Sequence, residues 1–259
     1  MKTSILQNKF LKSIIAIAFW TIAWYVAAWI INKEIFLPYP HSVIIRFTNL
    51  ITYPGFFRTV FASLLRIIVG FVIGTIIGFS LAFLTNYFKF AEVIVSPFIK
   101  VVRATPVVSF ILLAYLWLDN DTIPAFIALL MVAPIIWQNV SSGLANIDGN
   151  LTEMAMIFKL NKAKRFFKII LPQLNSYLYS GCLTSLGLAW KSGVAAEVIS
   201  YPQIAIGKEM NEAKVLLETT DVLVWTLTLI ILSIVFEVVF KFLFKNNNKV
   251  ISLVGGGKS

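Results

Sequence analysis

Six long runs of hydrophobic residues alternate along the chain with shorter segments that hold most of its charges. A helix needs roughly 20 mostly apolar residues to cross the hydrocarbon core of a bilayer, and each run comes close to that length. The pattern predicts an all-α integral membrane protein with six transmembrane helices, built as one domain over residues 1–259. The predicted spans are residues 13–31, 60–84, 97–118, 122–140, 176–200 and 222–244.

The first run needs a separate check, because Lys2, Lys9 and Lys12 before an apolar stretch are also typical of a signal peptide. This run is longer than the usual apolar region of a signal peptide, and three tryptophans are spread along it. We therefore expect a helix that is retained in the membrane.

Composition agrees with a membrane protein, since 59% of residues are hydrophobic and 13% charged, against about 45–50% and 25% in soluble domains. The net charge of +10 does not indicate nucleic-acid binding, because the basic residues lie between the apolar spans. With the N-terminus in the cytoplasm, fifteen of the 22 Lys and Arg residues fall in cytoplasmic segments and five in outer segments. The excess predicts a multi-pass membrane protein with both termini in the cytoplasm.

The cytoplasmic loop 150–172 has its own pattern, with two short amphipathic helices. The first runs through Glu153, Met154, Ala155 and Phe158, and the second begins after Asn161, which is a good N-cap. Such a pair could be gripped by another protein or could lie on anionic lipid. The periodicity leaves both interpretations open.

Two spans carry a stripe of small residues at four-residue spacing, which allows another helix to approach closely. One stripe ends near Arg66 and the other near Glu197, both close to the predicted outer boundary. A charge inside a membrane is costly without a partner. We therefore predict that these two helices pack face to face with Arg66 and Glu197 paired. The stripes are Gly70, Gly74, Gly78 and Ala82, and Gly181, Ser185, Ala189 and Gly193.

Lys191, beside Trp190, lies about 9 Å deeper than Glu197 at a helical rise of about 1.5 Å per residue. An ionisable residue at this depth is a candidate for a translocation path, and a cation suits an anionic solute. A structural lysine bonded to carbonyl or carboxylate oxygens is an equally good interpretation.

The third span is interrupted by Pro97 and Pro106 near its cytoplasmic end. A proline frees a backbone carbonyl and bends a helix, which a membrane tolerates where a water-lined cavity or a neighbouring group satisfies that carbonyl. Arg103 and Thr105 could then face a pathway, although Arg103 could equally reach the inner lipid headgroups.

The remaining segments predict little chemistry. Residues 32–59 hold at most a short helix along the membrane interface, and residues 201–221 form a short outer helix that contacts a binding protein or caps a pore. Residues 245–259 are a mobile polar tail. The sequence contains no phosphate-binding loop, metal-ligand cluster or nucleophile arrangement, so we expect no catalytic residues, no metal and no cofactor in this chain.

The loop and its surroundings resemble the permeases of ABC importers, closest to the nitrate, sulfonate and taurine group. The loop matches that family's pattern at Glu153, Ala155, Phe166, Ile169, Leu171 and Pro172. It departs at Met154 and at Lys159, where the family has glycine. The resemblance extends over about residues 36–240 and includes FLPYPHSV, SLLRIIVGFVIGTIIGF, SPFIKVVRATP and GLAWKSGVAAEVIS.

The resemblance implies a type I importer fold, a dimer with a second copy of the permease, two ATPase subunits that bind ATP and Mg, and an extracytoplasmic solute-binding protein. It also implies that Glu153 to Lys159 form a coupling helix docked in the ATPase, with Leu160, Asn161, Leu171 and Pro172 completing the loop. The solute would be small and anionic. A left-handed lysine costs roughly 1–2 kcal/mol, so either Lys159 accepts that strain or Asn161 makes the bend.

Two other functions remain to be compared with an importer. A secondary transporter driven by an ion gradient predicts paired acidic residues at the midplane and internal repeats, and the sequence has neither. A membrane scaffold without transport leaves Lys191 and the broken third span unexplained.

Overall fold

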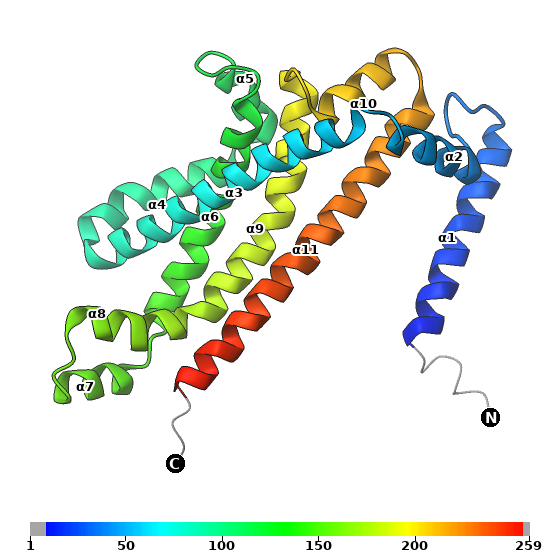
Figure 1. The fold of residues 1–259 in the computed structure, drawn as a ribbon. Helices are drawn as coiled ribbons and strands as arrows, with labels where there is room; N and C mark the ends of the chain where they lie inside the picture. The colour runs from blue at the N-terminus through cyan, green and yellow to red at the C-terminus, as the bar shows by residue number, and fades with distance from the viewer. Residues whose placement is uncertain (1–8, 256–259) are drawn as a thin grey trace, which may run out of the picture.

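The structure is a computed structural model that describes residues 9–255, with the backbone alone at residues 9, 10, 152, 156 and 245–255. The described chain is helical throughout and contains no strand (Figure 1). Its elements are α1 (Lys9–Ile31), α2 (Pro40–Ile51), α3 (Phe56–Tyr87), α4 (Lys89–Ala104), α5 (Val107–Ala114), α6 (Ile123–Ala145), α7 (Gly149–Ile157), α8 (Lys162–Arg165), the π-helix η2 (Phe166–Ile170), α9 (Leu171–Ser200), α10 (Ile206–Val215) and α11 (Thr219–Gly255).

Four helices within the described residues are long and apolar enough to cross a membrane: α1, α3, α6 and α11. The bent pair α4 and α5 makes a fifth if it is counted as one span. Helix α9, predicted as a span over residues 176–200, does not reach this apolarity, because serines, threonine, Lys191 and Glu197 interrupt its hydrophobic residues. The chain is therefore a multi-pass membrane protein in which one long helix is more polar than the others.

The centre of the molecule is formed by α3, α6 and α9, which share one hydrophobic core (Figure 1). The glycine stripe of α3 lies against α6, where a Cβ at Gly70 would be 2.2 Å from the carbonyl oxygen of Ala125. Gly74 and Gly78 approach the next two turns of α6 in the same way. The prediction that this stripe faces residues 176–200 is wrong, because α6 supplies the backbone that fills the space.

Helix α9 packs on α6 with its own small residues. Gly181 lies close to Asn139 of α6, whereas Gly193 lies against the side chain of Ile67 on α3. The contact between α9 and α3 therefore involves side chains of α3 and not its glycines.

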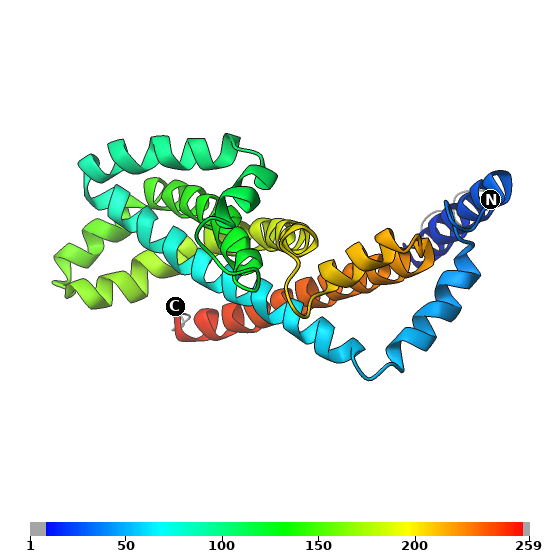
Figure 2. The same cartoon turned by 90° about the horizontal axis from the view of Figure 1, so that it is seen from above.

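The third predicted span is broken at Pro106, where α4 and α5 meet at an angle of 102°. Thr105 is extended at φ −79° and ψ 133°, since a following proline disfavours the helical conformation. Pro97, also predicted to interrupt the span, instead lies inside α4. Helix α4 begins at Lys89, earlier than the predicted start at 97, directly after the end of α3, and diverges from α3 along its length (Figure 2).

Helices α1 and α2 lie at one side of the bundle, and α7 and α8 lie at the opposite side (Figure 2). Most side chains of α1 are exposed, as expected of a helix that faces lipid. The indole nitrogen of Trp24 donates to the carbonyl oxygen of Pro38 at 3.0 Å and fixes α1 to the connection before α2.

The short helices expected within 32–59 and 201–221 are α2 and α10. Both lie at the end of the molecule opposite α7, while the start of α1 and the last turns of α11 lie at the same end as α7 (Figure 1). Helix α11 runs to Gly255, into the predicted tail 245–259, of which residues 256–259 lie outside the described residues.

Candidate functional site: a coupling loop and a polar helix

The bend after α7 is made by Lys159, which has a positive φ of 49°. The amide of Leu160 donates to the carbonyl oxygen of Ala155 at 3.0 Å, which is the long hydrogen bond of a Schellman cap. Asn161 is not left-handed, at φ −64°, and its side chain accepts from the amide of Lys164 at 2.8 Å. Of the two alternatives for the bend, the strained lysine is confirmed, and Asn161 is the N-cap that the sequence predicts.

Helix α7 presents an open apolar face. Met154, Ile157 and Phe158 are all exposed, Phe158 to 70%, and the carboxylate of Glu153 is exposed beside them. Ala155 is buried on the other side of the helix. An exposed apolar patch of this kind marks a surface that another protein can bind.

Helices α8, η2 and α9 form one continuous helical rod from residue 162 to residue 200. The amide of Leu171 bonds back to the carbonyl oxygen of Phe166, five residues earlier, which is the π-helical pattern. Pro172 follows directly and has no amide hydrogen to donate. The wider π-helical turn therefore lies where the proline interrupts the α-helical hydrogen bonds.

Two contacts attach the loop to the helices around it. The ring of Phe166 lies 5.6 Å from the ring of Phe83 on α3. At the start of the loop, the amide of Asp148 donates to the side-chain oxygen of Gln173 on α9 at 2.9 Å. A force on α7 would therefore be transmitted to α9 and α3.

The predicted ion pair between Arg66 and Glu197 is present, with 3.7 Å between guanidinium nitrogen and carboxylate oxygen. Glu197 is completely buried and accepts from Ser63 Oγ at 2.8 Å and from the amide of Gly207 at 3.2 Å. Arg66 also forms an ion pair with Asp121. This cluster joins α3, the connection before α6, α9 and α10.

Besides the amide of Gly207, sequence reasoning missed three members of this cluster: Ser63, Asp121 and the carbonyl of Ile204, to which Arg66 donates at 2.6 Å. The position of Ser63, about one helical turn before Arg66, was the available signal. The other two lie in connections whose approach to α3 could not be predicted.

Lys191 is exposed on a face of α9 that no other element of the described chain covers. Among the described side chains, no hydrogen bond or ion pair engages it. A Cβ added at Gly187, one turn earlier, would meet no atom within 4 Å. Trp190 is only 5% exposed, and its indole nitrogen has no hydrogen-bond partner among the residues that the structure describes. The exposed residues of this face are small or polar over most of its length: Ser176, Ser180, Thr184, Lys191 and Ala195, with Leu188.

Arg103 and Thr105 make contacts away from that face. Arg103 hydrogen-bonds the side chain of Gln138 on α6, and Thr105 Oγ1 donates to the carbonyl oxygen of Val101 at 2.8 Å. Pro106 forms the bend described above. Within the described chain, no hydrogen bond or ion pair joins these residues to Lys191.

This arrangement of helices and loop is that of a membrane transport component, and the family comparison agrees. Residues 70–252 match the profile of the family described as the binding-protein-dependent transport system inner membrane component. The match covers more than half of the sequence, and the chain belongs to this family.

Several curated relatives are similar at the sequence level. A protein of Brucella melitensis named as a probable ABC transporter permease is 28% identical over 76% of this chain and 80% of its own length. A Bacillus subtilis protein named as an aliphatic sulfonates transport permease is 25% identical, over 72% of this chain and 67% of its own length. The nitrate import permease of a Synechocystis species is 29% identical over 54% of this chain and 51% of its own length.

A solved structure supports the fold. The crystal structure of an amino acid ABC transporter with histidines superposes with a TM-score of 0.57, over 82% of this chain and 95% of that one. Its sequence identity is 17%, so the likeness concerns the fold alone.

Proposed function

We propose that this chain is the permease subunit of an ATP-driven importer for a small anionic solute. The observation that carries the proposal is the α7–α8 loop, which presents an open apolar face at one end of a rod that continues into α9. The rod provides a physical route from a docked ATPase to Lys191, in the far half of that helix.

The proposed topology has six spans, with α4 and α5 together as the third and α9 as the fifth, and both termini in the cytoplasm. The charge bias along the sequence supports it, since most Lys and Arg residues then lie inside. The common position of α7, the start of α1 and the last turns of α11 at one end of the molecule also supports it (Figure 1).

The open face of α9 supports a second copy of the permease as partner. A lysine that faces lipid at this depth is costly, whereas one that faces a water-filled path between two subunits is not. In this assembly two ATPase subunits bind ATP and Mg and dock on α7, and a solute-binding protein delivers the solute at the other end. The surrounding lipid is that of a bacterial plasma membrane.

An anionic solute is proposed from Lys191 together with the names of relatives. Those relatives are named for aliphatic sulfonates, nitrate and bicarbonate, which are all anions. Lys191 has no partner among the described side chains, so it can attract such a solute and no ion pair within that part of the chain has to break first.

Co-purification tests the docking surface. Phe158→Asp places a charge in the apolar face of α7, and Phe36→Asp makes the same change at a residue that is 68% exposed in the connection between α1 and α2. We expect the ATPase to co-purify with the wild type and with Phe36→Asp, but not with Phe158→Asp. Equal recovery of the ATPase with both variants would contradict docking at α7.

A further inference from the structure

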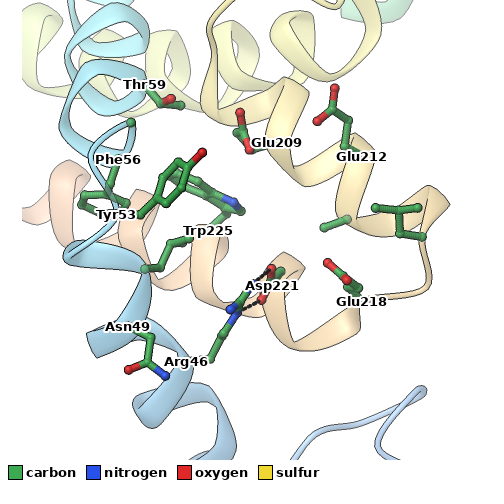
Figure 3. A pocket seen from close by; sticks show the side chains of 14 residues that line it. Arg46, Asn49, Tyr53, Phe56, Thr59, Glu209, Glu212, Glu218, Asp221 and Trp225 are labelled. Carbon is green, nitrogen blue, oxygen red and sulfur yellow. Dashed lines mark hydrogen bonds and ion pairs between the residues drawn. The ribbon is translucent and has the colours of Figure 1, made fainter.

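A cavity of about 500 Å³ lies at the end of the molecule opposite α7, between α2, α10 and the first turns of α3 and α11 (Figure 3). It lies outside the coupling loop, the Arg66 cluster and the open face of α9. None of the residues singled out by the family resemblance as functional lines it.

Acidic side chains gather around this cavity. Four of the twelve Asp and Glu residues of a chain with net charge +10 line it, namely Glu209, Glu212, Glu218 and Asp221. The cation that lines it is Arg46, which binds both carboxylate oxygens of Asp221, at 2.6 and 2.7 Å (Figure 3). The lining therefore has a formal excess of three negative charges.

Two of these carboxylates remain open to a ligand. Glu212 is engaged by Tyr201 and lies 3.7 Å from Lys208, but no hydrogen bond or ion pair engages the carboxylate of Glu209 or of Glu218 within the described chain. Burial, and then the charge of Glu212, raise the pKa of Glu209. A cation brought close to Glu209 would offset both effects.

Aromatic rings form the opposite wall. Phe56 and Trp225 stack with centroids 5.3 Å apart, and Tyr53 lies beside them. Trp225 is only 4% exposed, yet its indole nitrogen is turned toward the cavity and has no hydrogen-bond partner among the described residues (Figure 3). The indole N–H is therefore free to donate a hydrogen bond to an acceptor atom of a ligand in the cavity.

We propose that this cavity binds an organic cation, an ammonium or guanidinium group carried next to a hydrogen-bond acceptor. The cation lies between Glu209 and Glu218, where carboxylates and aromatic rings both favour positive charge. The acceptor lies at the N–H of Trp225. A basic side chain beside its own peptide carbonyl has this chemistry, and so does a small ammonium compound with a hydroxyl group.

Calorimetry on the purified chain in detergent tests the site with three probes. N-acetyl-lysine-N-methylamide carries both groups, choline is a small ammonium compound with a hydroxyl, and N-acetyl-norleucine-N-methylamide lacks the charge. We expect the lysine derivative to bind with a Kd on the order of a millimolar and the norleucine derivative at least tenfold more weakly. The proposal would be overturned if the lysine and norleucine derivatives bound with equal affinity. It would also be overturned if neither the lysine derivative nor choline bound.

Comparison of the two cations identifies the source of the ligand. Tighter binding of the lysine derivative indicates a basic side chain of a partner protein. Binding of choline that is equal or tighter indicates a free ammonium compound. Either result supports the site, because both require its negative charge.

Variants locate the binding. Glu209→Gln and Glu218→Gln keep the side-chain shape, and each is expected to weaken the binding of the lysine derivative about tenfold. Glu92→Gln removes a charge from the exposed first turn of α4 and should leave the affinity unchanged. Trp225→Phe removes the N–H and should weaken binding by about threefold to tenfold.

Circular dichroism of each variant checks that its helices are intact, and either glutamine variant alone is sufficient for the test. Wild-type affinity in folded Glu209→Gln and Glu218→Gln would place the binding elsewhere and refute the assignment. The assay needs no ATPase, so its outcome is independent of the proposed importer function.

Discussion

Lys159, Tyr201 and Leu217 each hold a positive φ at the end of a helix, at 49°, 54° and 59°. Glycine would adopt this conformation without strain, whereas side chains with a Cβ are disfavoured by roughly 1–2 kcal/mol. Each helix end is nevertheless closed by a backbone hydrogen bond, from Leu160 to Ala155 and from Glu218 to Ala213 in two of the three cases. The caps therefore hold a conformation that the residue itself disfavours.

Replacement of Lys159 by glycine tests this strain. We expect Lys159→Gly to be more stable than Lys159→Ala by about 1 kcal/mol, because both remove the same charge and alanine alone keeps the Cβ. Thermal unfolding of the two variants in detergent measures the difference. A lower unfolding temperature for the glycine variant would mean that the bend is not strained.

Lys191 is the residue on which the proposed anion preference depends. We expect Lys191→Gln to lower the uptake of labelled nitrate or sulfonate by about tenfold or more, and Lys191→Arg to keep most of it, because the positive charge attracts the solute. Association with the ATPase should be unchanged in both. Full uptake by an assembled Lys191→Gln variant would remove Lys191 from the path.

Helices α3 and α6 approach each other closely, and glycine is what permits the approach. The sequence shows the stripe of small residues but not which helix fills it. Helix α9 has the matching stripe of small residues, yet the three glycines of α3 face Ala128, Val132 and Ile136 of α6, so the choice depends on how the whole bundle packs.

Gly70 and Gly187 make a matched pair for this contact. Gly70→Ala would place a Cβ 2.2 Å from a carbonyl oxygen of α6, whereas Gly187→Ala meets nothing within 4 Å. We expect Gly70→Ala to destabilise the protein by about 1–3 kcal/mol and Gly187→Ala to have little effect. Thermal unfolding of both in detergent decides, and equal stability would argue against the α3–α6 contact.

The Arg66 cluster connects three helices and the connection before α6 through one buried carboxylate. Arg66→Ala leaves Glu197 buried without its cation and should cost about 3–5 kcal/mol. Addition of Glu197→Gln should recover part of the loss, because it removes the unpaired charge and keeps an acceptor for Ser63. Unfolding measurements on the two single variants and the double variant give the coupling, and simple additivity would show that the pair is not coupled.

At the scale of the whole molecule, the two ends have different characters. One end presents the apolar face of α7, and the other holds the Arg66 cluster and the acidic cavity (Figures 1 and 3). The rod of α8, η2 and α9 runs between them. An ATPase that moves α7 would therefore move the helix that carries Lys191 and Glu197.

Much of this arrangement could be predicted from residue patterns, but the pairing of distant segments could not. Hydrophobic runs located the long helices, and the cost of a buried charge predicted the partner of Arg66. The choice of Pro106 over Pro97 as the site of the bend, the α6 partner of the glycine stripe, and the cavity between α2 and α10 all depend on tertiary contacts. No local pattern encodes them.

ATP-driven uptake in proteoliposomes tests the central claim most directly. The permease is purified together with its ATPase and reconstituted into proteoliposomes. Labelled nitrate, sulfonate and bicarbonate are then added with the solute-binding protein. We predict uptake of at least one of these anions, and we expect this uptake to require both ATP and the binding protein. Phe158→Asp should abolish the uptake, whereas Phe36→Asp should preserve it. Uptake by the chain alone, driven by a sodium or proton gradient without ATP, would contradict the account.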